Sequence, residues 1–177
     1  MGAPEKHFTQ AIETSPLRAL MASIAHADKD GFDRILATNP QLADKNINEQ
    51  VEGMTPLVLA VRMALQVANQ TLEIRVFNGG PLDNEGTPIE RKPPEQVQRE
   101  KAIAVLMIKK LLACGADPTK KTVLGSALVL ADVLGEQDDP LKDGIRNLLE
   151  SANDRLLDNR DAEKWHKELN TRRDLIL

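Results

Sequence analysis

Histidine and cysteine are the side chains most able to bind a metal ion or attack a substrate, and this chain has few of them, widely separated. None of its histidines, His7, His26 and His166, has the i, i+4 partner of a helical zinc pair. The single cysteine, Cys114, lies in no motif typical of a thiol protease. We therefore predict no metal site and interpret Cys114 as a structural, half-buried thiol.

The acidic and phosphate-binding motifs of enzymes are also missing from the sequence. Asp83 and Glu85 lie beside Gly86, but this segment lacks the alternating ligands and terminal Glu of a calcium loop. No Gly-x-x-x-x-Gly-Lys-Ser/Thr segment occurs, so nucleotide hydrolysis has no support. An enzyme needs polar groups that converge on a pocket, and the sequence offers no such set. We predict a protein without catalytic residues or cofactors.

The composition predicts one folded, all-helical domain. A length of 177 residues suits a single domain, and 41% hydrophobic with 28% charged residues is typical of a globular protein. Aromatic residues make up only 2%, so the core must consist mainly of aliphatic side chains and Met, which favour packed helices. A net charge of −4 argues against nucleic-acid binding, which needs a dense cationic surface.

The sequence also bears on the cellular compartment. No stretch approaches the roughly 20 apolar residues of a membrane span. The amino terminus, MGAPEKHFTQ, lacks the basic and apolar blocks of a secretory signal. A single cysteine is what a reducing compartment leads us to expect. We therefore expect a cytoplasmic protein without a membrane partner, with export into a host cell cytosol as the alternative.

Three segments share the pattern of a helix start. They are "SPLRALMAS" from Ser15, "TPLVLAVRM" from Thr55 and "SALVLADVL" from Ser126. A Ser or Thr oxygen accepts a hydrogen bond from the first turn, and Pro suits the first helical position, which needs no N–H. A second helical run follows each start, beginning at Phe32, Ala102 and Leu141. The pattern thus predicts three helix pairs joined by turns.

Two segments resemble the ankyrin repeat, whose signature is a Thr-Pro-Leu-His-x-Ala helix start and a Leu-Leu-x-x-Gly-Ala-Asp helix end. They are "EGMTPLVLAV" (52–61) and "IKKLLACGADPTKKTVLGSALVLA" (108–131), in which Gly115 is expected to close the helix in a left-handed conformation. "DKDGFDRILATNPQLAD" is similar to the looser first repeat of many such proteins. The resemblance implies an all-α, ankyrin-type solenoid of about three repeats over residues 15–152.

The chain departs from that pattern in two ways. The signature His is replaced by Arg18, Val58 and Val129, so the hydrogen bond it makes between turns must be replaced or lost. The helix starts lie about 40 and about 71 residues apart, against a family period of about 33. The middle repeat therefore contains an insertion at about 64–101. Residues 72–76 alternate as a strand would, but we favour lengthened helices on either side of a loop at about 78–94, with Pro94 opening the second helix.

Both ends of the predicted stack need a cover, because bare apolar ends associate with one another. We assign residues 1–14 to an N-terminal capping segment and residues 153–177 to a C-terminal capping helix that begins near Asp158 or Asn159. Four apolar residues would fall on one side of that helix and cover the last repeat: Ala162, Trp165, Leu169 and Ile176. With both ends covered, we expect a monomer.

The resemblance implies a non-catalytic module that binds a partner protein, of a kind the sequence does not name. The contacts would come from turn tips and from the exposed ends of the first helices. Carried onto this chain, these are Glu52, Met54, Arg62, Met63, Lys120, Lys121, Val133 and Leu134, with Ala22 and Ser23 at the matching end in the first repeat. The long, Pro- and Gly-rich insertion is our hypothesis for specificity.

A second function class is a secreted bacterial effector or inhibitor that uses the same scaffold to target a host or competitor protein. The polar, Glu-containing carboxyl tail agrees with specialised export and equally with a capping helix. Loss of export after removal of 162–177, with folding intact, would distinguish the two. Turnover in an unbiased substrate screen would instead support an enzyme.

Overall fold

The computed structural model describes residues 15–65, 93–134 and 139–174, apart from the side chains of 44–45 and 165–174. These residues form α-helices and one π-helical turn, with two isolated β-bridges and no β-strand. The all-helical class predicted from composition is confirmed for this part of the chain. The elements in order are α1 (Pro16–Ala25), α2 (Lys29–Thr38), η1 (Leu42–Asn46), α3 (Pro56–Leu65), α4 (Pro94–Ala113), α5 (Ala127–Val133) and α6 (Pro140–Asp174).

The three predicted helix starts are confirmed. The side chains of Ser15, Thr55 and Ser126 each accept a hydrogen bond, at 3.3 Å, from the backbone N–H three residues later. Pro16 and Pro56 are the first residues of α1 and α3. Because these signals are local, they fix where the three helices begin before any tertiary contact forms.

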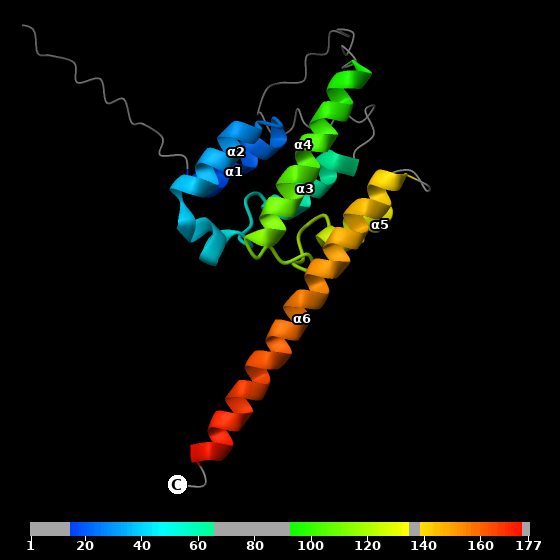
Figure 1. Cartoon of the computed structure of the whole chain (residues 1–177). Helices are drawn as coiled ribbons and strands as arrows, with labels where there is room; N and C mark the ends of the chain where they lie inside the picture. The colour runs from blue at the N-terminus through cyan, green and yellow to red at the C-terminus, as the bar shows by residue number, and fades with distance from the viewer. Residues whose placement is uncertain (1–14, 66–92, 135–138, 175–177) are drawn as a thin grey trace, which may run out of the picture.

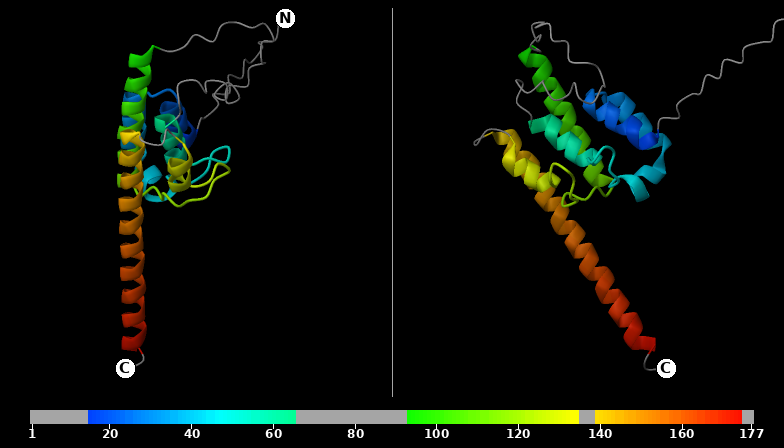
Figure 2. Two further views of the ribbon diagram at one scale, coloured as in Figure 1. Left: turned by 90° about the vertical axis from the view of Figure 1, so that its right-hand side faces the viewer. Right: turned by 180° about the vertical axis from the view of Figure 1, so that it is seen from behind.

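The helices pack as two layers (Figures 1 and 2). α1, α3 and α5 lie in one layer, and α2, α4 and α6 lie in the other. α3 is the central element and packs against α1, α4 and α5. Nearly every side chain of α3 is buried, as expected for a helix that is apolar all round and is covered on several sides.

The bounds of α4 confirm the predicted lengthening of the second helix of the middle pair. α3 is described as far as Leu65, so the predicted lengthening of this first helix lies outside the described residues. α4 begins at Pro94, so residues 94–101 belong to a 20-residue helix. Gly115 closes this helix with φ of 84°, the left-handed conformation predicted from sequence. The strand considered at 72–76, most of the predicted loop at 78–94 and the capping segment 1–14 lie outside the described residues.

The prediction of a separate C-terminal helix starting near Asp158 or Asn159 is wrong. α6 runs without a break from Pro140 to Asp174, because no Pro or Gly interrupts it after Gly144. Its 35 residues correspond to roughly 50 Å. Figure 1 shows its second half continuing beyond the other helices, and Ala162 is exposed. The described part of the tail therefore does not fold over α5.

Candidate functional site

Two tight turns precede α3 and α5, and each is closed by a pair of backbone hydrogen bonds. The first tip, Val51–Met54, has N–H···O distances of 2.9 and 3.1 Å, and the second tip, Thr122–Gly125, has both at 3.1 Å. Glycine in the left-handed region allows these turns, with φ of 80° at Gly53 and 95° at Gly125. Both tips are therefore defined by their own backbone.

The two tips are joined to each other. The N–H of Val123 donates to the carbonyl of Gly53 at 3.1 Å. A Cβ atom on Gly53 would lie 2.8 Å from Cγ1 of Val123, so the valine side chain packs directly on the glycine. The tips consequently form one continuous edge and do not behave as two independent loops.

Two amide side chains strengthen this connection. Oδ1 of Asn48 accepts a hydrogen bond from the N–H of Asp117 at 2.7 Å, and its Nδ2 donates to the carbonyl of Gly115 at 3.1 Å. Nε2 of Gln50 donates to the carbonyl of Lys121 at 2.6 Å. These bonds link successive turns in a chain whose helix starts contain no histidine.

Asn48→Ala is expected to lower the free energy of unfolding by about 1–2 kcal/mol, because it removes two hydrogen bonds and leaves a half-buried N–H without its acceptor. Urea denaturation followed by circular dichroism measures the change. Asn159→Ala, at an exposed position on α6, serves as the control and should shift stability by less than about 0.5 kcal/mol. Equal effects of the two substitutions would contradict the assigned role of Asn48.

Four exposed apolar side chains lie on the second tip and on the helix that follows it. Val123 is 76% exposed, Val129 53% and Val133 72%, and Leu124 completes the set. Cγ1 of Val129 would lie 3.5 Å from a Cβ on Gly125, which connects the tip to α5. We call these four residues the apolar surface. Exposed apolar clusters of this kind mark interaction sites on soluble proteins.

The residues proposed from sequence as partner contacts have different environments. Met54 is 4% exposed and belongs to the core, so its side chain is not available to a partner. Glu52, Lys120, Lys121, Val133 and Ala22 are exposed, whereas Arg62, Met63 and Leu134 are half-buried and Ser23 is buried. Sequence reasoning missed Val123, Leu124 and Val129. The signal for the first two was an apolar pair in the turn "KKTVLG".

Several charged side chains on the second helices and in the loop after α4 form salt bridges. Asp33 on α2 forms salt bridges with Lys29 and with Lys110 of α4. Hydrogen bonds from Lys110 and Lys29 hold the pKa of Asp33 below its ordinary value. Asp117 forms a salt bridge with Arg160 of α6 at 3.3 Å. Lys120 and Lys121 remain as exposed cations beside the second tip.

The pKa of Asp117 is lowered although burial alone would raise it, because Thr119 donates two hydrogen bonds to the carboxylate and Arg160 lies beside it. A depressed pKa in the folded state means that this carboxylate stabilises the fold above its ordinary pKa of 3.8. That stability is lost as the pH falls through the folded pKa. Asp117→Asn should therefore flatten the fall in thermal midpoint below about pH 4, which a pH series of melting curves measures. An unchanged slope would contradict this.

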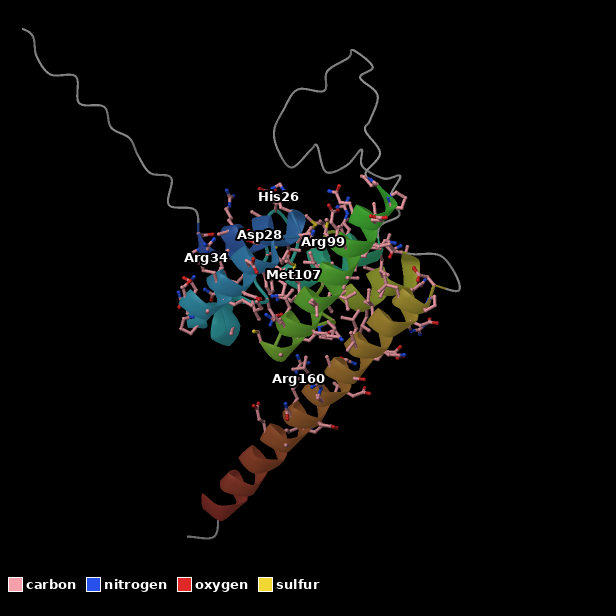
Figure 3. The ribbon with its side chains drawn as sticks, turned by 45° about the horizontal axis from the view of Figure 1, so that its top comes forward. His26, Asp28, Arg34, Arg99, Met107 and Arg160 are labelled. Carbon is pink, nitrogen blue, oxygen red and sulfur yellow. The ribbon has the colours of Figure 1, made fainter. Side chains whose placement is uncertain are left out.

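A cavity lies near the start of α4. It opens between the α1–α2 turn and the start of α4, and His26, Arg99 and Glu100 are among its lining residues. His26 and Arg99 are labelled in Figure 3. Among the described residues no group of three or more His, Cys, Asp or Glu side chains lies close enough to hold a metal ion. Cys114 is half-buried, and burial raises the pKa of its thiol.

Comparisons with family models, curated proteins and solved structures returned no match to this chain. Within the described ranges, no helix combines the length and the apolar character that a membrane span requires.

Proposed function

We propose that this protein is a non-catalytic module that binds a partner protein, built as an ankyrin-type solenoid of about three helix pairs. The two helix layers, the hydrogen-bonded tips and the left-handed Gly115 support this proposal. The single observation that carries it is the apolar surface, where most of the large exposed apolar side chains of the described residues are found. A soluble protein rarely leaves such a cluster uncovered unless something docks there.

The proposed mechanism is rigid presentation. Backbone hydrogen bonds close each tip, and the bond from Val123 to Gly53 fixes one tip against the other. A surface held in this way loses little conformational entropy when a partner docks, so most of the contact energy contributes to affinity. The partner contacts are the apolar surface (Val123, Leu124, Val129 and Val133), with Glu52, Arg62, Met63, Lys120, Lys121 and Leu134 around it.

The charges beside the apolar surface favour a partner segment with acidic residues. Lys120 and Lys121 lie just before the second tip and are exposed. Asp132, the acidic residue between Val129 and Val133, forms a salt bridge with Arg146 at 3.3 Å, so its charge is already compensated. We therefore infer that the partner segment has apolar side chains with acidic residues at the end that faces the two lysines.

The proposal is tested by binding measurements on surface variants. The partner is first identified by affinity capture from the cells that produce the protein and then purified. Val133→Glu and Val129→Glu are each expected to weaken its binding by at least about tenfold, because each places a charge in a docked apolar contact. Lys120→Glu with Lys121→Glu should slow association and reduce its dependence on salt.

Leu106→Glu is the matched control, because Leu106 is an exposed leucine on α4, 44% accessible, and is not part of the apolar surface. It should leave affinity unchanged. Weaker binding by Leu106→Glu alone, or full affinity in both valine variants, would overturn the assigned surface. Deletion of residues 78–93 tests the contribution of the insertion, and unchanged affinity would remove it from the proposal.

A further inference from the structure

The apolar surface is a narrow stripe that follows α5. Val129 and Val133 are four residues apart, so they lie on one side of α5, one helical turn from each other. The contact of Val129 with Gly125 continues the stripe to the second tip, where Val123 and Leu124 are exposed. α5 has seven residues and is therefore roughly 10 Å long. A short segment of a partner is enough to cover the stripe.

The backbone N–H groups of the second tip are already used within the chain. Those of Thr122 and Gly125 donate to each other's carbonyl groups, and that of Leu124 donates to Oγ1 of Thr122, all at 3.1 Å. The N–H of Val123 donates to Gly53. A partner that adds a β-strand needs free donors on the edge that it joins. These four residues offer none, so an added strand would leave carbonyl groups unpaired.

The start of α5 is equally closed to an extended segment. The N–H of Val129 donates to Oγ of Ser126, and the N–H of Leu128 donates to the carbonyl of Pro118 at 3.2 Å. A proline-rich segment needs no backbone partner, but it docks between aromatic side chains, and the apolar surface consists of valine and leucine. An α-helix pairs its own backbone groups and repeats its side chains at the spacing of Val129 and Val133. A helix therefore fits this surface.

The charges along the stripe give such a helix a direction. Lys120 and Lys121 are exposed at the end where α5 begins, whereas Asp132, near the other end, is compensated by Arg146. Carboxylates are favourable in the first turn of a helix and unfavourable in the last. A helix that begins beside the two lysines gains from both effects, because its first-turn carboxylates face cations. Glu52 on the first tip is also exposed and opposes carboxylates placed over that tip.

We propose that the apolar surface binds a single amphipathic α-helix of a different protein, which lies along α5 in the same direction and carries carboxylates in its first turn. Apolar residues of two to three turns of this helix cover the stripe. The inference rests on the protein-binding role proposed above and adds the conformation, direction and charge of the bound segment.

A second copy of the chain is a poor source of that helix. Among the described helices, α2, α4 and α6 have an acidic residue in the first turn. Their apolar residues pack mainly into the core of their own chain, and each of α4 and α6 has one large apolar side chain exposed, Leu106 and Leu157. None of the three therefore offers an exposed apolar stripe along its described side chains.

The probe for the test is a synthetic peptide. Photo-cross-linking from Val129 and Val133 in the cells that produce the protein, followed by mass spectrometry, locates the contacted segment of the captured protein, and the peptide reproduces that segment. It should bind the full chain, gain a helical circular dichroism signal on binding, and bind Val129→Glu at least about tenfold more weakly. Leu106→Glu is the control and should bind it normally. Normal binding to Val129→Glu would overturn the proposed function and this inference together.

A proline in the middle of the peptide tests the helical conformation alone. It is placed where alanine leaves the affinity unchanged, so that no side-chain contact is lost. Because proline breaks a helix, the affinity should fall by at least about tenfold. Full affinity of the proline peptide, together with weak binding to Val129→Glu, would overturn the helical segment and leave the proposed function standing.

Charge reversal tests the direction of the helix. Lys120→Glu with Lys121→Glu should weaken binding of the peptide several-fold, and lysines in place of the first-turn carboxylates should restore it. A peptide with the same lysines in its last turn is the control and should not. Restoration by the last-turn lysines alone, or a segment without first-turn carboxylates, would overturn the assigned direction. A cross-linked segment that belongs to a second copy of this chain would overturn the assignment to a different protein.

Discussion

Leu57→Ala is expected to lower the free energy of unfolding by about 3–4 kcal/mol. Leu57 is 1% exposed and lies in α3, which packs against α1, α4 and α5. Truncation removes buried methyl groups and leaves a cavity where the surrounding helices meet, with little room for them to collapse. Urea denaturation measures the loss, and the transition should remain single because α3 connects both sides of the stack.

Leu106→Ala is the matched control for this experiment. It removes the same atoms from an exposed position on α4 and should change stability by less than about 1 kcal/mol. Two separate transitions in the Leu57→Ala protein would mean that the helix pairs on either side of α3 unfold independently. A loss for Leu57→Ala no larger than for Leu106→Ala would contradict the central position of α3.

Gly53→Ala is expected to lower the free energy of unfolding by about 2–3 kcal/mol. Part of this loss arises because an L-residue is strained at φ of 80°. The rest arises because the new Cβ would lie 2.8 Å from Cγ1 of Val123, which must move and weaken its hydrogen bond to residue 53. Thermal and urea unfolding of the purified variant measure the total.

Gly115→Ala separates these two contributions. Gly115 has φ of 84°, but a Cβ there would meet nothing within 4 Å. Its substitution should cost only the backbone strain, about 1–2 kcal/mol. The difference between the two variants therefore measures the packing of the second tip on the first. Equal losses would mean that Val123 does not hold the tips together.

The helix starts and the closure at Gly115 were predictable from sequence because their causes are local. A Ser or Thr hydroxyl caps the residue three positions later, proline suits the first turn, and glycine adopts the left-handed conformation at low cost. None of these effects depends on distant residues. The same reasoning placed Pro94 at the start of α4, eight residues before the apolar run at Ala102.

The C-terminal prediction was wrong because it took Asp158 and Asn159 as the start of a new helix. Such residues cap a helix where the preceding chain is not helical, but here the preceding turn of α6 continues and no Pro or Gly stops it. Burial of an apolar stripe against the last helix pair was assumed from spacing alone. Spacing places residues on one side of a helix without determining what that side contacts.

The apolar surface was missed for a related reason. Val58 and Val129 each follow a capping residue by three positions, and the sequence gives them similar surroundings. Val58 is 1% exposed because α3 has neighbours on both sides in its layer, whereas Val129 is 53% exposed because α5 is the last helix of that layer. Exposure at these positions therefore depends on what packs next to the helix, which no local pattern records.

Site-specific photo-cross-linking tests the proposed docking role of the apolar surface most directly. A photoreactive amino acid is placed at Val123, Val129, Val133 or, as a control, Leu106, and the full chain is irradiated in the cells that produce it. If the apolar surface is the docking site, the first three positions capture one and the same protein, while Leu106 does not capture it. Equal capture of that protein from all four positions, or no common protein at the three valines, would contradict it.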